Sequence, residues 1–400
     1  MNELVIKEPV WSADGFTTEL VENGASLGAF YVKADHPLRN KSDDIISLII
    51  SSCVKARYER IVYPFSVSSR TFQELQAFSP ETDIAVPSVY DPDDTVGRSD
   101  LQSLNVSGGL DSCAMAALFG ERPPAFTDYE CKEAERAMNK TFDSYIVHTN
   151  ARNFPFFKHS IGYYNIASII RSMEEGLGYT ANGKTLDEDF HVLMWAVYDY
   201  DSPLNITAPN TVNGVPMIFP VCGFTALGTQ KIVHDLCPQL YQQSIDASVC
   251  DAPHKQLYIA MRDSIIQRKT CSHTLPPSYF ILSAFMFVYY AQKLNIVNNP
   301  LPFDPAELLR KTRGLDLSFY GKYDRRVLQL IPGPLREILQ SRLESKGVQF
   351  YTDEDYRVRE SVLTDTLTAM AAAGINIDAT LTDTARRALR KKQEGLNDGA

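Results

Sequence analysis

The sequence lacks the features that define several common classes of protein. Its seven cysteines include no Cys-x-x-Cys pair, so we expect reduced thiols and a cytoplasmic protein and not a disulfide framework. The first residues, MNELVIKEPVWSADG, have no basic segment followed by a long apolar core, so no secretory signal is expected. The longest apolar stretch, Tyr279–Ala291, is too short to cross a bilayer and predicts a buried helix. Internal repeats and low-complexity segments are absent as well.

The charge balance argues against a further class, the general nucleic-acid binders. Such proteins are usually basic, whereas this chain carries a formal net charge of −10. A hydrophobic content of 44% and a charged content of 22% are ordinary for a soluble globular protein. The 400 residues are enough for two or three domains with a large core. We therefore expect no membrane partner and no general affinity for nucleic acid, and a homo-oligomer stays open.

The most informative segment is Ser103–Ser112, which reads SLNVSGGLDS. A short apolar strand is followed by two glycines, an acid and a hydroxyl, and an apolar helical run begins at Cys113. The glycines allow a tight turn that brings N–H groups close to an anion, and the helix adds the positive end of its dipole. Ser107 and Ser112 can donate hydrogen bonds to phosphate oxygens, and Asp111 suits a Mg²⁺ ion that bridges to the phosphates. The pattern predicts a phosphate-binding loop, and the alternative is an ordinary strand–turn–helix junction.

The hexapeptide Ser107–Ser112 resembles the PP-loop of the ATP pyrophosphatase superfamily, a family with a HUP-like nucleotide-binding fold. This superfamily includes the synthetases of GMP, NAD, argininosuccinate and asparagine, and the 7-cyano-7-deazaguanine synthases, which this layout resembles most. A Walker A loop is excluded, because no Gly-Lys-Ser/Thr follows the glycines. The resemblance implies that the whole segment binds ATP and that Asp111 holds Mg²⁺. It assigns catalysis to Ser107, Asp111 and Ser112, with Gly108, Gly109 and Leu110 completing the nucleotide site.

Strand and helix signals alternate after the start of this segment, which predicts an α/β protein with a parallel sheet. Strands are expected at 103–106, 124–128 and 144–149, with helices at 112–119 and 130–142 between them. PP-loop domains have this order, so the resemblance covers about residues 100–150. Further strands are expected at 4–6, 29–32, 60–65, 191–197 and 217–221, and further helices at 43–58, 69–78, 161–177, 223–236, 304–312, 333–344, 354–373 and 382–393.

These signals divide the chain into three expected parts. Residues 1–98 form an N-terminal α+β domain that ends in a Pro- and Asp-rich linker, PSVYDPDDTVGR. Residues 99–275 form the PP-loop domain, and residues 276–400 form a helical C-terminal region.

Two further segments belong to the nucleotide site that the resemblance implies. In the family the second strand runs past the adenine, and Phe126, Thr127 and Asp128 occupy that position here. The alternative is that this strand is only sheet core. A later PP-loop segment is similar to residues 223–236, where Thr229 stands in place of a frequent lysine. Lys231 is then the cation expected to reach the pyrophosphate.

Three polar residues follow the strand expected at 144–149. In open α/β sheets the carboxyl ends of strands face the ligand crevice, so His148, Asn150 and Arg152 are candidates for substrate or nucleotide contacts. They suit an ordinary capped loop equally well. Arg268 and Lys269 are candidates for a second cationic contact with the phosphates, although adjacent cations are more often solvated.

Zinc is not expected. The 7-cyano-7-deazaguanine synthases bind zinc through cysteines in the region that corresponds to residues 244–271. Here the thiols and imidazoles of this region have a spacing that matches no common zinc motif. These residues are Cys250, His254, Cys271 and His273.

Together with the resemblance, the sequence predicts an ATP-dependent adenylating enzyme. An acceptor oxygen attacks the α-phosphorus of ATP and pyrophosphate leaves, while the protein mainly positions the groups and neutralises charge. The most similar relatives imply a ligase or amidating enzyme that acts in nucleobase-type modification. One alternative is an asparagine-synthetase-like amidotransferase without its own glutaminase, since residue 2 is Asn2 and not a nucleophilic cysteine. The other is a domain that binds nucleotide without catalysis.

Overall fold

The computed structural model describes residues 2–54, 57–92, 102–156, 162–186, 211–212, 215–249, 253–270, 281–294, 303–331 and 333–375. Contacts divide the chain into two units. Unit 1 comprises residues 1–112, 120–183 and 204–219, and unit 2 comprises residues 113–119, 184–203 and 220–400. The domain boundaries expected near residues 98 and 275 lie outside the described residues and stay predictions.

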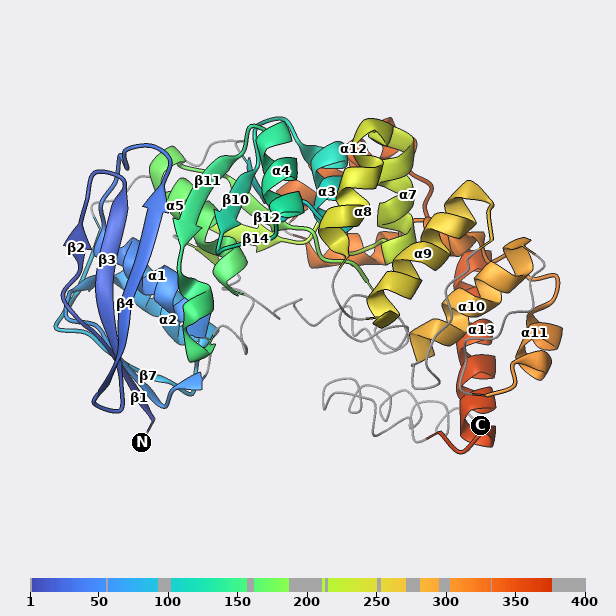
Figure 1. Cartoon of the computed structure of the whole chain (residues 1–400), viewed down its shortest axis with the longest axis horizontal. Helices are drawn as coiled ribbons and strands as arrows, with labels where there is room; N and C mark the ends of the chain where they lie inside the picture. Colours follow the sequence, from blue (N-terminus) through green and yellow to red (C-terminus); the bar gives the residue numbers. More distant parts are fainter. Residues whose placement is uncertain are drawn as a thin grey trace. The chain divides into compact units, whose positions relative to one another are not determined.

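Unit 1 is built on a 12-stranded sheet with the order β13-β14-β12-β9-β10-β11-β4-β3-β1-β5-β7, to which β2 adds by pairing with β3 (Figure 1). A separate two-stranded sheet joins β6 and β8. The strands are β1 Glu3–Ile6, β2 Val10–Trp11, β3 Gly15–Glu22, β4 Ala25–Ala34, β5 Arg60–Val62, β6 Val67–Ser68, β7 Asp83–Ala85, β8 Val89–Tyr90, β9 Gln102–Asn105, β10 Ala125–Asp128, β11 Tyr145–Thr149, β12 Tyr179–Asn182, β13 Thr211–Val212 and β14 Val215–Ile218.

Five strands of this sheet have the order of a doubly wound α/β fold. Across the sheet they run β11-β10-β9-β12-β14, and every neighbouring pair is parallel. Numbered along the chain, this is the order 3-2-1-4-5. The α/β class expected from the sequence is confirmed. Because the chain moves to one side of β9 with β10 and β11 and to the other side with β12, the order reverses beside β9, and this reversal is where such sheets bind ligands.

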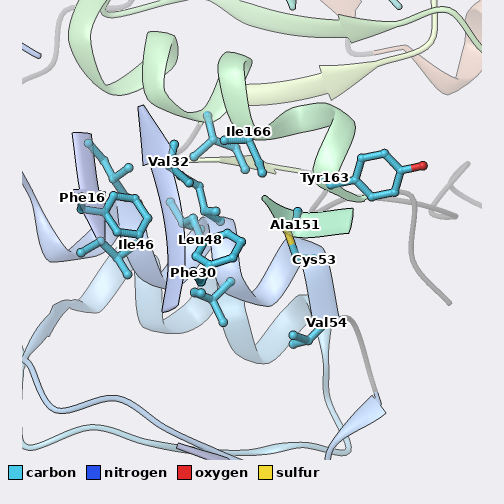
Figure 2. Close-up of a cluster of buried hydrophobic side chains, with 14 of the residues drawn as sticks. Phe16, Phe30, Val32, Ile46, Leu48, Cys53, Val54, Ala151, Tyr163 and Ile166 are labelled. Atoms are coloured by element: carbon cyan, nitrogen blue, oxygen red, sulfur yellow. The ribbon is translucent and has the colours of Figure 1, made fainter. Parts of the chain in front are cut away.

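The N-terminal strands and the parallel strands share one hydrophobic core. Strand β4 pairs with β11 in antiparallel fashion, with Val32 opposite Thr149. Figure 2 shows Phe16, Phe30 and Ile46 in the same buried cluster as Ile166. Helix α1 (Asp43–Val54) is apolar and buried over almost its whole length, because it packs against α2, α5 and a 3-10 turn of unit 1.

Helix α5 packs on the parallel strands. It ends at a glycine, the residue type that most readily adopts a left-handed backbone conformation. It contacts β9, β10, β11 and β12, and Gly176 after its last turn has a φ of 59°. The helices and 3-10 turns of unit 1, apart from α1, are α2 Ser69–Phe78, α4 Glu133–Thr141, η2 Ala151–Asn153, η4 Gly162–Asn165 and α5 Ile166–Glu175. Helix α3, Leu110–Phe119, begins in unit 1 and continues into the segment that groups with unit 2.

The elements described in unit 2 are helical. They are α7 Ala226–Leu236, η5 Pro238–Leu240, α8 Tyr241–Ser248, α9 Pro253–Gln267, α10 Ile281–Leu294, α11 Ala306–Thr312, η6 Ser318–Gly321, η7 Arg325–Leu330, α12 Gly333–Ser345 and α13 Asp353–Ala372. A buried ion pair ties this unit together, since Arg359 donates to the Asp324 carboxylate at 3.0 Å. None of the helices within the described ranges has the length and apolarity that a membrane span requires.

Most of the expected elements are present, with ends that differ by a few residues. Helix α2 begins and ends where the sequence predicts. The expected strand at 191–197 and the expected helix at 382–393 lie outside the described residues. The elements that were not predicted include the strands β3 and β12, several two- and three-residue strands, and the helices α8 and α9.

Candidate functional site

The segment Ser107–Ser112, which we call the glycine loop, follows β9 at the carboxyl ends of the parallel strands. The Val106 N–H donates to the Ala125 carbonyl at 3.0 Å, which holds the chain against β10 just before it turns. Gly108 has a φ of 91°, a left-handed conformation, and a β-carbon at this position would lie 3.0 Å from Cβ of Met138 on α4. Glycine is therefore required both by the turn and by the close approach of α4.

Helix α3 begins within the glycine loop. Leu110 is buried and anchors the first turn, while Asp111 in the same turn is half-buried. The first N–H groups of a helix have no partner inside the helix, and the helix dipole adds positive potential there. The start of α3 therefore suits a negatively charged ligand such as a phosphate group.

The two serines at the ends of the glycine loop meet in the structure. Their hydroxyl oxygens lie 3.2 Å apart, and the Ser112 hydroxyl also donates to the Gly109 carbonyl at 3.0 Å. The turn thus closes on itself and brings both hydroxyl groups to one place. Ser107 is half-buried and Ser112 is buried, so Ser107 is the more accessible of the two.

The end of β12 forms the other side of this region. Strands β9 and β12 are in register with Asn182 opposite Asn105, so the chain leaves both strands at the same level of the sheet. The next residue, Gly183, packs on the glycine loop, because a β-carbon on it would lie 2.7 Å from the backbone nitrogen of Ser112. The glycine loop and the end of β12 therefore adjoin where the strand order reverses, which is the ligand-binding position of doubly wound sheets.

The three residues expected to contact adenine lie on β10. Two of their side chains, however, are buried in the core. Phe126 is buried in the hydrophobic cluster. The Thr127 hydroxyl donates to the Tyr164 carbonyl at 3.2 Å and accepts from the Ala167 N–H at 3.0 Å. On the side of β9, only Ala125 of this strand is in register with a partner. Residues 126–128 thus extend past the end of β9, and the backbone of β10 is what this strand offers to a nucleotide.

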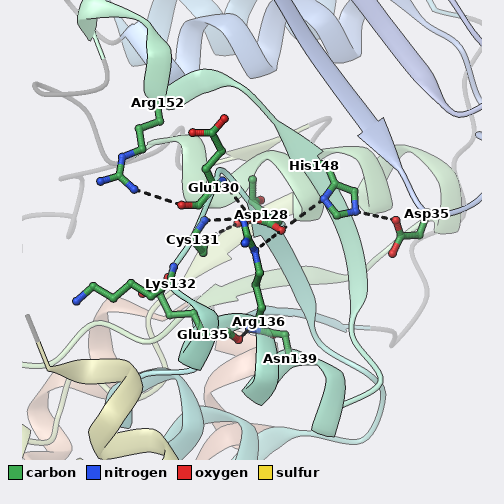
Figure 3. A network of polar contacts seen from close by, with 11 residues as sticks. Asp35, Asp128, Glu130, Cys131, Lys132, Glu135, Arg136, Asn139, His148 and Arg152 are labelled. Carbon is green, nitrogen blue, oxygen red and sulfur yellow. Dashed lines mark hydrogen bonds and ion pairs between the residues drawn. The ribbon is translucent and has the colours of Figure 1, made fainter.

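Asp128, the last residue of β10, is the centre of a polar network (Figure 3). Its carboxylate accepts two hydrogen bonds from the Arg136 guanidinium, at 2.9 and 3.1 Å. The N–H groups of Glu130 and Cys131 donate to the same carboxylate at 3.0 and 3.1 Å. Burial acts to raise the pKa of Asp128, but the hydrogen bonds with Arg136 and Cys131 outweigh it and lower that pKa. The group is a fixed anion and not a proton donor at neutral pH.

His148 links this network to a second carboxylate. Its Nδ1 atom lies 3.5 Å from Asp128, and its Nε2 atom lies 2.8 Å from Asp35, which follows β4 (Figure 3). The imidazole, near the carboxyl end of β11, is held between Asp128 at the end of β10 and Asp35 just after β4. Sequence analysis identified His148 and Asp128 separately, and it missed Asp35 and Arg136.

The structure gives Asn150 and Arg152 local partners. The Asn150 side chain accepts from the Tyr31 N–H at 2.9 Å and donates to the Ala29 carbonyl at 2.7 Å, so it fastens the end of β11 to β4. Arg152 donates to the Glu130 carbonyl at 3.2 Å (Figure 3). These contacts fit the capped-loop alternative for both residues.

The remaining cationic candidates belong to unit 2. Lys231 on α7 forms an ion pair with Asp235 one turn later in the helix. Lys269 pairs with Asp263, and Arg268 has a φ of 55° just after α9. Their proposed contacts with phosphate stay predictions.

The zinc question concerns residues that the structure does not describe in full. Cys250, Cys271 and His273 lie outside the described residues, and so does the side chain of His254. In the rest of the chain, over the described residues alone, no group of three or more His, Cys, Asp and Glu side chains could hold a metal ion.

Comparisons with family models, with curated proteins and with solved structures found no match for this chain. The glycine loop and the sheet that carries it are therefore the features of this chain that bear on its function.

Proposed function

We propose that the protein binds MgATP at the glycine loop and transfers the adenylyl group to an acceptor, with release of pyrophosphate. The observation that carries the proposal is the position of Ser107–Ser112. The loop follows the first strand of a 3-2-1-4-5 parallel sheet and opens a helix at the point where the strand order reverses. An ordinary strand–turn–helix junction has no need of two hydroxyl groups and a carboxylate at that point.

Each part of the loop has a role in this proposal. The N–H groups around Gly108 and Gly109 and the start of α3 bind the pyrophosphate end of ATP. The hydroxyl groups of Ser107 and Ser112, 3.2 Å apart, donate to the phosphate oxygens. Charge that develops on the leaving pyrophosphate is thus stabilised by donors that the fold holds in place before the reaction.

The residues at the loop fit a magnesium ion that arrives with the nucleotide. Mg²⁺ is usually held by one or two carboxylates together with phosphate oxygens and water. Asp111 supplies one half-buried carboxylate in the first turn of α3. Bound there, the metal would neutralise phosphate charge. Asp111 would hold the ion, and the hydroxyl groups of the loop would orient the phosphates.

Binding of MgATP, measured by calorimetry, tests the site. Asp111→Asn is expected to weaken binding of MgATP by at least about tenfold, because it removes the charge that faces the metal. Asp143→Asn is the matched control: Asp143 lies at the amino end of β11, and its φ of 51° is one that asparagine tolerates. Equal MgATP affinity in the wild type and both variants would remove Asp111 from the site.

The products test the reaction. With ATP labelled at the α-phosphate and fractionated cell extract as the source of acceptor, adenylyl transfer yields labelled AMP or an adenylated acceptor, and unlabelled pyrophosphate. Labelled ADP as the only product would exclude cleavage between the α- and β-phosphates. Tight binding of MgATP without turnover in any fraction would favour the non-catalytic module, and activity that depends on ammonia would favour the amidotransferase.

A further inference from the structure

Three asparagine side chains join the ends of β9 and β12, and we call Asn105, Asn165 and Asn182 the amide triad. Asn165 lies at the end of η4, just before α5. Its Oδ1 atom accepts from Nδ2 of Asn105 at 3.1 Å and from Nδ2 of Asn182 at 2.8 Å. Asn105 and Asn182 are register partners on neighbouring strands, so the side-chain oxygen of Asn165 bridges the ends of β9 and β12.

The amide triad continues into two buried serines, and together these residues form a polar seam between the sheet and α5. The Ser168 hydroxyl donates to Oδ1 of Asn105 and lies 3.3 Å from the Ser103 hydroxyl. Asn165 is 1% exposed and Asn105 6% exposed. Buried polar groups add little net stability over apolar ones of the same shape, but a satisfied network fixes one geometry. A gain in stability therefore does not by itself account for the seam, whereas the single geometry that a satisfied network fixes does account for it.

Both strand ends lead into the glycine loop region. The chain runs from Asn105 through Val106 into the loop, and it runs from Asn182 into Gly183, which packs against Ser112. A shift of one strand end along the other would push Gly183 into the start of α3 or open a gap there. Groups that bind a ligand or react with it must be held within about 0.5 Å of the productive geometry. The spacing of these two strand ends therefore affects how well the loop binds a phosphate.

We propose that Asn165 is a positioning residue for the glycine loop: by bridging Asn105 and Asn182 it sets the position of Gly183 against Ser112 and keeps the loop in its phosphate-binding shape. The inference rests on the proposed function of Ser107–Ser112. It goes further by assigning a role to a residue that is 53 positions after Ser112 in the sequence and lies outside the glycine loop.

The test compares the affinities of the full-length protein for MgATP and for AMP by calorimetry. Asn165→Leu keeps the branching and the number of heavy atoms of the side chain and removes the acceptor, and it is expected to weaken MgATP binding by about tenfold, as for a misplacement well below 1 Å. Affinity for AMP is expected to stay within about twofold, because AMP lacks the pyrophosphate that the loop holds. Asn165→Asp keeps an acceptor for both amides and should recover most of the MgATP affinity, even though a buried charge lowers the unfolding temperature.

A matched control separates positioning from general loss of stability. Asn139 is also fully buried, and its side chain donates to the Glu135 carbonyl and accepts from the Ser144 hydroxyl, at the amino end of β11. Asn139→Leu should lower the unfolding temperature as Asn165→Leu does and leave MgATP affinity unchanged. If Asn165→Leu does not fold, Asn182→Ala removes only the arm to β12 and is expected to cause the same selective loss.

The outcomes separate this inference from the proposed function. If Asp111→Asn weakens MgATP binding and Asn165→Leu does not, Asn165 is only structural and the inference fails alone. If the Asn165 and Asn139 variants lose affinity for MgATP and AMP alike, the effect is general destabilisation and the inference fails again. If the wild type binds no MgATP, the proposed function and the inference fail together.

Discussion

Gly183 abuts Ser112 with no room for a side chain. A β-carbon on Gly183 would lie 2.7 Å from both Cα and the backbone nitrogen of Ser112, a separation that real β-carbons do not show. Both neighbours are backbone atoms, so neither can move away by a side-chain rotation. The end of β12 and the start of α3 are thus fitted to each other through a single glycine.

Gly183→Ala is therefore expected to disturb the glycine loop. Relief of the clash requires a shift of β12 or of α3, at a cost of about 1–3 kcal/mol in the free energy of unfolding. The affinity for MgATP should fall by about tenfold or more, because the displaced atoms belong to the start of α3. Thermal unfolding and calorimetry measure the two effects.

Gly333→Ala is the control for this substitution. No heavy atom lies within 4 Å of a β-carbon at Gly333, which is the first residue of α12. The unfolding temperature and MgATP affinity of this variant should equal those of the wild type. A Gly183→Ala protein with unchanged affinity would mean that the contact with Ser112 does not matter to the site.

Gly108→Ala tests the turn of the loop itself. Gly108 has a φ of 91°, where alanine is strained by about 1 kcal/mol, and the added methyl group would press on Met138 of α4. The strain should open the turn and weaken MgATP binding by about tenfold. Calorimetry with MgATP and circular dichroism during heating would measure affinity and stability together.

Gly24 offers a comparison with the same backbone strain and no nearby site. It has a φ of 84° between β3 and β4, and no heavy atom lies within 4 Å of a β-carbon there. Gly24→Ala should lose stability by a similar amount and bind MgATP normally. Equal losses of affinity in both variants would contradict a special role for Gly108.

The glycine loop could be read from the sequence because its signal is local. Two glycines, an acid and flanking hydroxyl groups stand between an apolar strand and an apolar helix within ten residues, 103–112. The strand β12 gave no such signal, although it forms the other side of the region. Two of its four side chains, Thr180 and Asn182, are polar, and Asn182 donates to Asn165 just before α5. Hydrophobic periodicity cannot detect a strand of this kind.

The polar networks around the glycine loop could not be predicted from the sequence, for a different reason. Asp35 meets His148 across 113 positions of sequence, and Asn165 meets Asn105 across 60. No spacing rule connects such residues, because the pairing of β4 with β11 and the packing of α5 bring them together. The sequence did identify His148 and Asp128 as residues at strand ends, but their partners required the topology of the sheet.

The reactivity of the thiols tests the core of both units. Cys53 of α1 and Cys222 of unit 2 are at most 2% exposed, and burial raises the pKa of both thiols. Cys237 is half-buried, and burial raises its thiol pKa to a lesser degree. A maleimide reacts with the accessible thiolate, so peptide mapping after brief labelling should show modification of Cys237 well before Cys53 and Cys222. All three should react in urea, and early modification of Cys53 in the native protein would contradict the buried position of α1.

The ion pair of Asp128 with Arg136 predicts how stability depends on pH. The folded-state pKa of Asp128 lies below its ordinary value of 3.8. The carboxylate therefore contributes stability that is complete above the unfolded-state pKa and is lost as the pH falls through the folded-state pKa. Arg136→Gln removes two of the hydrogen bonds that lower the pKa of Asp128, so burial is opposed mainly by the backbone N–H groups and the pKa rises. Because the Arg136 side chain is 45% exposed and solvent screens the pair, the variant should lose about 1 kcal/mol of unfolding free energy at neutral pH. Its difference from the wild type should shrink below about pH 4.

Urea unfolding followed by circular dichroism, repeated from about pH 3 to about pH 7, measures this dependence. Arg310→Gln provides the comparison, because Arg310 also donates two hydrogen bonds to one carboxylate, that of Glu307, but on an exposed helix surface. Water replaces those bonds at little cost, so its urea midpoint should match that of the wild type at every pH. If Arg136→Gln behaved like Arg310→Gln, Asp128 would not be the fixed anion at the centre of the network. His148, which lies between Asp128 and Asp35, would then lack the charge on Asp128 that holds its Nδ1 atom in place.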